Sequence, residues 1–195
     1  KACAELVSKA FRESFFQETQ QIHLATARAG NVIGGGDWAK DRLVPDIFRA
    51  FAANEAVVIR NPISVRPWQH VMECVSGYLH LAHSLATTGS SFSEPWNFVP
   101  SPDDVKTVQW IVEKLVQTWG KNAQWKTDSS TRNPHEARHL SLDSTKAQIR
   151  LGWRPKWNLE QTLQHTAEWY KNYYDGYDMK KKTLSQIESY LSFES

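Results

Sequence analysis

The stretch from Thr26 to Asp46 constrains the fold of this 195-residue chain more than any other. A short apolar run ends in Arg28-Ala29-Gly30-Asn31, three consecutive glycines follow at 34–36, and a charged loop leads into a segment with helical periodicity. Alternating strands, glycine-rich loops and helices build ligand crevices at the carboxyl ends of strands in α/β proteins. The stretch therefore predicts an α/β fold with a binding site near its glycines.

Helical segments alternate with short extended segments along the whole chain. Periodicity, caps and turn residues predict helices at 1–16, 43–53, 71–85, 105–119, 143–151 and 159–174, and strands at 22–27, 57–59, 66–71, 96–99 and 123–126. In the first helix, Ala4, Val7, Phe11 and Phe15 share one stripe. So few strands among so many helices fit half of an α/β protein better than a complete one. Because the first helix has no N-cap residue, we expect the chain to have been cut from something longer.

Composition narrows the class of protein. Apolar residues make up 41% and charged residues 23%, which is typical of a soluble globular protein. A net charge of +2 is too weak to favour a nucleic-acid or anionic-membrane partner. Cys3 and Cys74 match no metal-ligand spacing, so we expect no metal site and reduced thiols in a cytoplasmic protein. No apolar run is long enough to predict a membrane span.

Several side chains around the glycine loop suit an anionic, hydroxyl-rich ligand. The amide of Asn31 can donate to a phosphate oxygen and accept from a hydroxyl, although a turn asparagine explains it equally well. Arg42, Arg60 and Arg66 are spaced loop arginines, and guanidinium groups bind a diphosphate bidentately. Any one of them, taken alone, is more often a surface residue.

The motif at Gly30–Leu43, Gly-Asn-Val-Ile-Gly-Gly-Gly-Asp-Trp-Ala-x-Asp-Arg-Leu, resembles the CDP-glucose 4,6-dehydratases. These are extended short-chain dehydrogenase/reductase enzymes that act on nucleotide sugars. Arg-Pro-Trp-Gln-His-Val at 66–71 and Leu-Gly-Trp-Arg-Pro-Lys-Trp at 151–157 are similar to the same family. Within the first of these, Trp68 and His70 are expected either to line the pocket or to pack beneath it.

The resemblance implies the C-terminal half of such an enzyme. We expect a remnant of a Rossmann-type parallel sheet at 1–30 and a smaller, mostly helical substrate-binding domain at 31–195, with some segments returning to the sheet. The chain is expected to lack the glycine-rich NAD loop, the catalytic tyrosine and the elimination acid/base pair. Alone, it is predicted to be inactive and to expose an apolar strand edge.

Roles for individual residues also follow from the resemblance. Lys1 resembles the lysine of the family's Tyr-x-x-x-Lys pair, a catalytic residue that also binds NAD. Without the resemblance, Lys1 is simply the first residue of the chain and carries no functional signal. Ala29 and Gly30 would lie near the nicotinamide, and Asn31 and Arg66 would contact the diphosphate. The remaining implied substrate-binding residues are Arg42, Leu43, Arg60, Arg132 and His135.

The activity that the resemblance implies is NAD-dependent dehydration of CDP-D-glucose. The sugar is oxidised at C4, water leaves across C5–C6, and the hydride returns to C6, so the reaction is that of a lyase. The product, CDP-4-dehydro-6-deoxy-D-glucose, is a precursor of the dideoxysugars of bacterial O-antigen. A homo-oligomer, dimer or tetramer, is expected. A nucleotide-sugar epimerase or decarboxylase of the same fold and a non-catalytic nucleotide-binding module are the alternatives.

Overall fold

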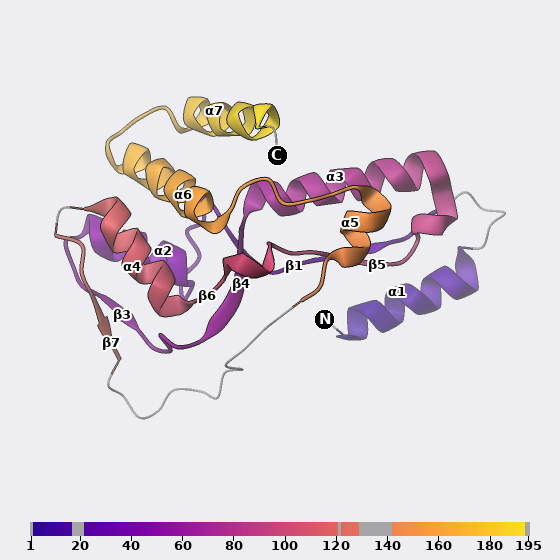
Figure 1. The fold of residues 1–195 in the computed structure, drawn as a ribbon, viewed down its shortest axis with the longest axis horizontal. Helices are drawn as coiled ribbons and strands as arrows, with labels where there is room; N and C mark the ends of the chain where they lie inside the picture. Colours follow the sequence, from indigo (N-terminus) through magenta and orange to yellow (C-terminus); the bar gives the residue numbers. More distant parts are fainter. Residues whose placement is uncertain (1, 17–21, 121, 129–141, 194–195) are drawn as a thin grey trace.

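Helices and mostly parallel strands alternate along the chain, which makes it an α/β protein (Figure 1). The computed structural model describes residues 2–16, 22–120, 122–128 and 142–193. The helices are α1 (Ala2–Phe15), α2 (Leu43–Ala52), α3 (Val71–Thr88), α4 (Val108–Trp119), α5 (Thr145–Leu151), α6 (Leu159–Tyr174) and α7 (Met179–Ser192). The strands are β1 (Thr26–Ala29), β2 (Asn31–Ile33), β3 (Val57–Ile59), β4 (Val65–His70), β5 (Pro95–Phe98), β6 (Val105–Thr107) and β7 (Trp125–Thr127). Two 3-10 helices, η2 (Gly89–Phe92) and η3 (Pro102–Asp104), complete the elements.

The strands pair in three small sheets. β1 pairs in parallel with β5, and β3 pairs in parallel with β7. β4 lies at the centre of the third sheet, parallel to β2 and antiparallel to β6. β2 follows β1 after a single residue, so the sheet of β2, β4 and β6 connects the β1–β5 pair to the rest of the molecule.

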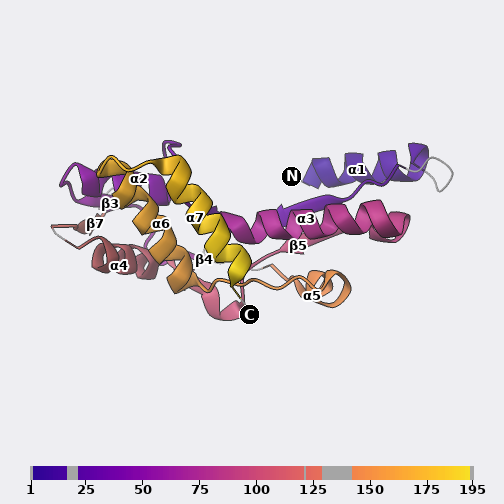
Figure 2. The ribbon, with the colours of Figure 1, turned by 90° about the horizontal axis from the view of Figure 1, so that it is seen from above.

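The described residues form two hydrophobic cores, which lie apart along an elongated molecule (Figures 1 and 2). The larger core lies among α2, α4, α6 and β3, where Phe48, Ile111 and Leu115 are completely buried. The smaller core lies among α3, α5 and β5, around Trp96, Phe98 and Trp153. The domain boundary near residue 30 stays a prediction. β5 lies far beyond that boundary in sequence, yet it pairs with β1.

Helix α6 confirms its predicted register. The four residues expected on its apolar stripe are all buried: Leu159, Leu163, Ala167 and Tyr170. Asn158 and Gln161 form a reciprocal capping box at its start, which satisfies otherwise unpaired backbone donors.

Several boundaries differ from the sequence-based expectation, and for two of them the structure shows the reason. The strand expected at 22–27 begins only at Thr26, because the preceding residues do not reach β5 in register. The helix expected from 105 begins at Val108, since residues 105–107 form β6 against β4. The buried Asp104 stabilises the start of a different helix, α6, because its carboxylate accepts a hydrogen bond from Leu159 N at 2.9 Å.

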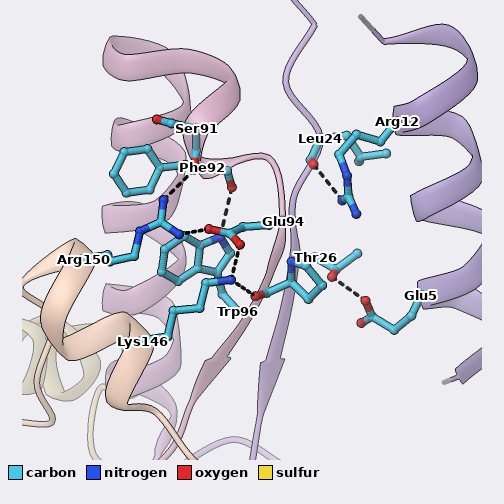
Figure 3. Close-up of polar contacts among 11 residues, drawn as sticks. Glu5, Arg12, Leu24, Thr26, Ser91, Phe92, Glu94, Trp96, Lys146 and Arg150 are labelled. Atoms are coloured by element: carbon cyan, nitrogen blue, oxygen red, sulfur yellow. Dashed lines mark hydrogen bonds and ion pairs between the residues drawn. The ribbon is translucent and has the colours of Figure 1, made fainter.

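Helix α1 is held to β1 by polar side chains rather than by its apolar stripe (Figure 3). The Glu5 carboxylate accepts a hydrogen bond from Thr26 Oγ1 at 2.8 Å and pairs with Arg28 at 3.3 Å. Arg12 donates to the carbonyl of Leu24. The stripe of Val7, Phe11 and Phe15 is about half exposed, so within the described residues it packs into neither core.

Helix α5 flanks β5 through a cluster of charged and aromatic side chains (Figure 3). Lys146 and Arg150 both pair with Glu94. The two cations also lie 4.4 Å and 5.2 Å from the centre of the Trp96 ring, which stacks on Phe92. Cation–π contacts of this kind fix a short helix that buries little apolar surface of its own.

The C-terminal helix α7 is anchored by a fully buried carboxylate on α3. Glu73 accepts hydrogen bonds from Tyr190 Oη at 2.8 Å, from Lys156 N at 3.0 Å and from Trp157 N at 2.8 Å. Three donors compensate the desolvation of the carboxylate. Burial nevertheless raises the pKa of Glu73.

We predict that Tyr190→Phe lowers the free energy of unfolding by about 1–3 kcal/mol, since it leaves a buried carboxylate short of one donor. Urea unfolding followed by tryptophan fluorescence measures the change. Tyr177→Phe, which removes an exposed hydroxyl just before α7, is the matched control and should stay within about 0.5 kcal/mol. Equal stability of the Tyr190 and Tyr177 variants would show that the buried contact does not anchor α7.

Candidate functional site

A cleft of about 1160 Å³ opens beside the N-terminus of α2. Its walls come from the turn after β1, from β2 and β3, from the start of β4, and from the loop at 34–42 that joins β2 to α2. This volume is slightly above that of typical small-molecule sites, about 300–1,000 Å³. It accommodates a ligand the size of a nucleotide.

Six of the residues that the sequence singled out line this cleft: Gly30, Asn31, Arg42, Leu43, Arg60 and Arg66. Ala29 ends β1 directly before Gly30 and is not part of the lining. Lys1, Arg132 and His135 lie outside the described residues. The ligand-binding roles of all ten stay predictions.

Strand pairing brings Asn31 and Arg66 to the cleft. Asn31 lies directly opposite Trp68 in the parallel register of β2 and β4. Arg66 precedes Trp68 by two residues, so the two side chains point to the same face of β4 and both line the cleft. Only 7% of Arg66 is exposed, and its guanidinium donates to the carbonyl of Val65 at 2.8 Å. A guanidinium held in such a partly desolvated wall interacts more strongly with an anion than one on the open surface.

The N-terminus of α2 adds positive electrostatic potential to the same cleft. Arg42 is the N-cap residue, with an extended backbone, and makes no side-chain capping hydrogen bond. Leu43 and Pro45 follow in the first turn, where proline is tolerated. The first backbone N–H groups of a helix and its dipole both favour a bound anion. Together with Arg60, which follows β3, these groups suit a phosphate or diphosphate.

Carboxylates line the cleft as well: Asp37, Asp41, Asp46 and Asp128. Asp46 forms an ion pair with Arg49, which offsets its charge. An ionised carboxylate only accepts hydrogen bonds and therefore suits hydroxyl donors. The cleft thus combines groups for an anion with groups for a polyhydroxylated ligand. Asp37 and Asp41 lie in the 34–42 loop, Asp46 lies on α2 and Asp128 follows β7, so no sequence pattern relates these acids to a shared cleft.

Trp68 and His70 have different positions. Trp68 lines the cleft and also belongs to the larger core, and its Nε1 donates to Lys106 O at 3.3 Å. His70 lies beneath, only 1% exposed, with its ring 4.9 Å from that of Trp157. Its Nδ1 accepts a hydrogen bond from Met72 N and so caps α3. His70 therefore supports the cleft without lining it.

Two glycines are needed for packing, in addition to any contact with a ligand. A Cβ on Gly30 would come within 2.6 Å of the carbonyl oxygen of Pro67, so the close approach of β4 to the bend between β1 and β2 requires glycine there. A Cβ on Gly35 would lie 2.0 Å from Trp169 Cγ. Within the triple glycine, Gly35 therefore accommodates an aromatic ring of α6.

The described residues show two further negative findings. No group of three histidine, cysteine or acidic side chains among them could hold a metal ion. Within the same part of the chain, no helix has both the length and the apolar character that crossing a membrane requires.

The fold is that of the extended short-chain dehydrogenases. The chain aligns over 91% of its length with a dTDP-glucose 4,6-dehydratase from Streptomyces venezuelae, with a TM-score of 0.73, 18% identity and 51% of that chain covered. A UDP-glucuronic acid 4-epimerase from Bacillus cereus gives a TM-score of 0.72 and 18% identity over 87% of this chain and 50% of that one. At this identity, the likeness shows the fold alone.

The sequence model of the GDP-mannose 4,6 dehydratase family matches residues 1–166, and the chain belongs to this family. It is also 52% identical to the CDP-glucose 4,6-dehydratase of Salmonella typhimurium (strain LT2), over 98% of this chain. The match covers 54% of that relative, so the chain spans about half its length.

We predict that the stability of the protein falls as the pH drops below 6.5. Burial, with a smaller contribution from His165, lowers the pKa of His70 from 6.5 to about 3. Between these values the unfolded chain binds a proton that the folded chain does not. The stability that neutral His70 contributes is complete above pH 6.5 and is lost as the pH falls toward 3, with a slope of up to about 1.4 kcal/mol per pH unit.

Urea unfolding at several pH values tests this prediction. His70→Asn keeps a side-chain acceptor at the N-cap of α3 but cannot titrate. The free energy of unfolding of this variant should therefore change less steeply with pH, by up to about 1.4 kcal/mol per pH unit. The exposed His83 on the same helix supplies the matched control His83→Asn, which should keep the slope of the parent. His165 remains in both variants. An unchanged slope in the His70 variant would show that His70 does not cause the loss of stability at low pH.

Proposed function

We propose that this chain forms the nucleotide-sugar-binding part of an NAD-dependent CDP-glucose 4,6-dehydratase. The observation that carries the proposal is the placement of three arginines and the N-terminus of α2 on one cleft: Arg42, Arg60 and Arg66. Fixed guanidinium groups bind a diphosphate bidentately. The 52% identity to the Salmonella enzyme favours CDP-glucose as the substrate and a lyase reaction.

In this proposal the arginines and Asn31 bind the diphosphate, while cleft carboxylates accept hydrogen bonds from sugar hydroxyls. Leu43 supplies an apolar contact at the same helix terminus. Arg132 and His135 are proposed to approach the nucleotide, as the resemblance implies. Because Arg66 is buried in the wall, its orientation is set before a ligand arrives, which reduces the entropy lost on binding.

The residues at the end of β1 fit a nicotinamide cofactor. Gly30 lines the cleft, and Ala29 directly before it carries only a methyl group, so no large side chain projects from this stretch of backbone. When bound, NAD supplies the hydride acceptor and donor of the reaction. Ala29 and Gly30 would hold its nicotinamide end. Lys1 is proposed as the lysine that binds the adjoining ribose.

The proposal extends to the biological setting. The product would serve dideoxysugar synthesis for the O-antigen of bacterial lipopolysaccharide, in the cytoplasm, and the enzyme would be a homodimer or homotetramer. A 4-epimerase or decarboxylase is the second candidate, since an epimerase shares the fold almost equally well. A non-catalytic nucleotide-binding module is the third.

A hybrid protein tests the activity directly. In the Salmonella dehydratase, this chain would replace the segment that it matches, so that the rest of the enzyme is supplied. We expect a 4-keto product from CDP-glucose, and none from UDP-glucose or dTDP-glucose. The chain by itself should give none. A folded hybrid that instead epimerises or decarboxylates another nucleotide sugar would overturn the dehydratase assignment, and one that only binds CDP would favour the binding module.

In the hybrid, Arg66→Ala should raise the KM for CDP-glucose roughly 10- to 150-fold, the range expected for losing hydrogen bonds to a charged group. Arg66→Lys is the matched variant. It keeps the charge but loses the fork geometry, so its effect should lie between the parent and the alanine variant. Thermal unfolding checks that both variants are folded. A folded Arg66→Ala variant with an unchanged KM would remove Arg66 from the diphosphate site.

A further inference from the structure

The loop at 34–42 forms one wall of the cleft but contains little structure of its own. Five residues of this loop are part of the cleft lining: Gly34, Asp37, Ala39, Asp41 and Arg42. The hydrogen bond from Ala39 N to Asp37 Oδ1, at 2.9 Å, lies within the loop. Asp41 has a φ of 60°, a left-handed conformation that costs free energy in a residue with a Cβ. The conformation of this wall therefore depends on contacts from other elements.

Helix α6 holds the first half of the loop. The Tyr170 hydroxyl donates a hydrogen bond to the carbonyl oxygen of Asp37. The Trp169 ring packs onto Gly35 so closely that no Cβ would fit. That ring is itself fixed from α7, because its Nε1 donates to Thr183 Oγ1 at 3.0 Å.

Helix α2 holds the second half. The Arg49 guanidinium donates to the carbonyl oxygens of Trp38 and Ala39, each at 3.1 Å. Its ion pair with Asp46 keeps the guanidinium in place. Three consecutive carbonyls, at 37–39, are thus held by two side chains from two helices.

An aromatic cluster pins the middle of the loop to the core. The Trp38 ring lies 4.6 Å from the ring of Tyr173 and 5.3 Å, edge-on, from that of Tyr170. Tyr170 in turn stacks on Phe48 of the larger core at 4.2 Å. Yet Trp38 remains 40% exposed, so burial alone does not account for this arrangement.

We propose that Tyr170 and Arg49 are positioning residues for the nucleotide-sugar site, holding the 34–42 loop so that Arg42 and the start of α2 face the bound anion. This inference rests on the proposed function and deepens it. A loop that is already ordered loses less conformational entropy when a ligand binds. Loosening the clamp should therefore weaken substrate binding while leaving the chemical step nearly unchanged.

Three variants of the hybrid dehydratase test the clamp. Tyr170→Phe removes one carbonyl contact, and Arg49→Lys keeps the charge beside Asp46 but cannot donate to two carbonyls as a fork does. Tyr173→Phe is the matched control. It removes a hydroxyl from the same helix and the same cluster, and that hydroxyl makes no hydrogen bond within the described part of the chain.

The first readout is amide hydrogen exchange of a peptide spanning 37–41, measured by mass spectrometry. We expect exchange roughly 2- to 12-fold faster in the Tyr170 and Arg49 variants, corresponding to one lost hydrogen bond, and unchanged in the Tyr173 variant. The three variants should have the same midpoint of thermal unfolding. Parent-like exchange in both test variants would overturn the clamp, as would equal acceleration in the control.

The second readout is steady-state kinetics with CDP-glucose. KM should rise roughly 2- to 12-fold in the test variants, with kcat changed less than about twofold. A fall in kcat with no change in KM would overturn the positioning role. If the hybrid shows no turnover, the proposed function fails separately. Calorimetric binding of CDP then replaces KM, and an unchanged Kd together with parent-like exchange would overturn the clamp on its own terms.

Discussion

Strand β4 is the element on which the two ends of the molecule depend. Arg66 and Trp68 turn to the cleft on one face of the strand, while Pro67 lies against Gly30 at the end of β1. Gln69, almost fully buried, donates to the carbonyl of Phe98 in β5 at 2.8 Å. The last residue of the strand caps α3. Six residues thus connect the cleft, the larger core and the β1–β5 pair, so a change in the register of β4 would move the arginine and the cleft floor together.

Much of the helical structure could be predicted from the sequence, because the signals were local. α6 carries four apolar residues at helical spacing and its own capping box, and α5 ends at Gly152 in the left-handed conformation that glycine readily adopts. The lysines at 180–182 lie in the first turn of α7, where Lys182 pairs with Glu168 at 2.5 Å. Such elements are specified by residues within a few turns of one another.

The features that escaped prediction depend on distant residues. Residues 105–107 form a strand only because β4 lies beside them, and Asp104 acts on a helix 55 residues further along the chain. Asn31, Arg42, Arg60 and Arg66 were found from residue type and a family resemblance, and the structure places them on one cleft. The cleft carboxylates and the clamp of Tyr170 and Arg49 gave no sequence signal, because each depends on a contact made by the fold.

The fold itself does not choose among the reactions of the family. A dehydratase and an epimerase match the chain with TM-scores of 0.73 and 0.72, so the choice rests on sequence identity and on the chemistry of the cleft. Arginines grouped beside a helix N-terminus suit the diphosphate that CDP-, UDP- and dTDP-sugars share. Selectivity for CDP-glucose would therefore have to come from other parts of the cleft, one wall of which is the ordered 34–42 loop.

The most direct test of this account is a crystal structure of the hybrid dehydratase with CDP-glucose bound. The account predicts the diphosphate in the cleft, within hydrogen-bonding distance of Arg66 and beside the N-terminus of α2, with the 34–42 loop in the position described above. A nucleotide sugar bound elsewhere, or a diphosphate that contacts neither Arg66 nor the start of α2, would contradict the assignment of this cleft.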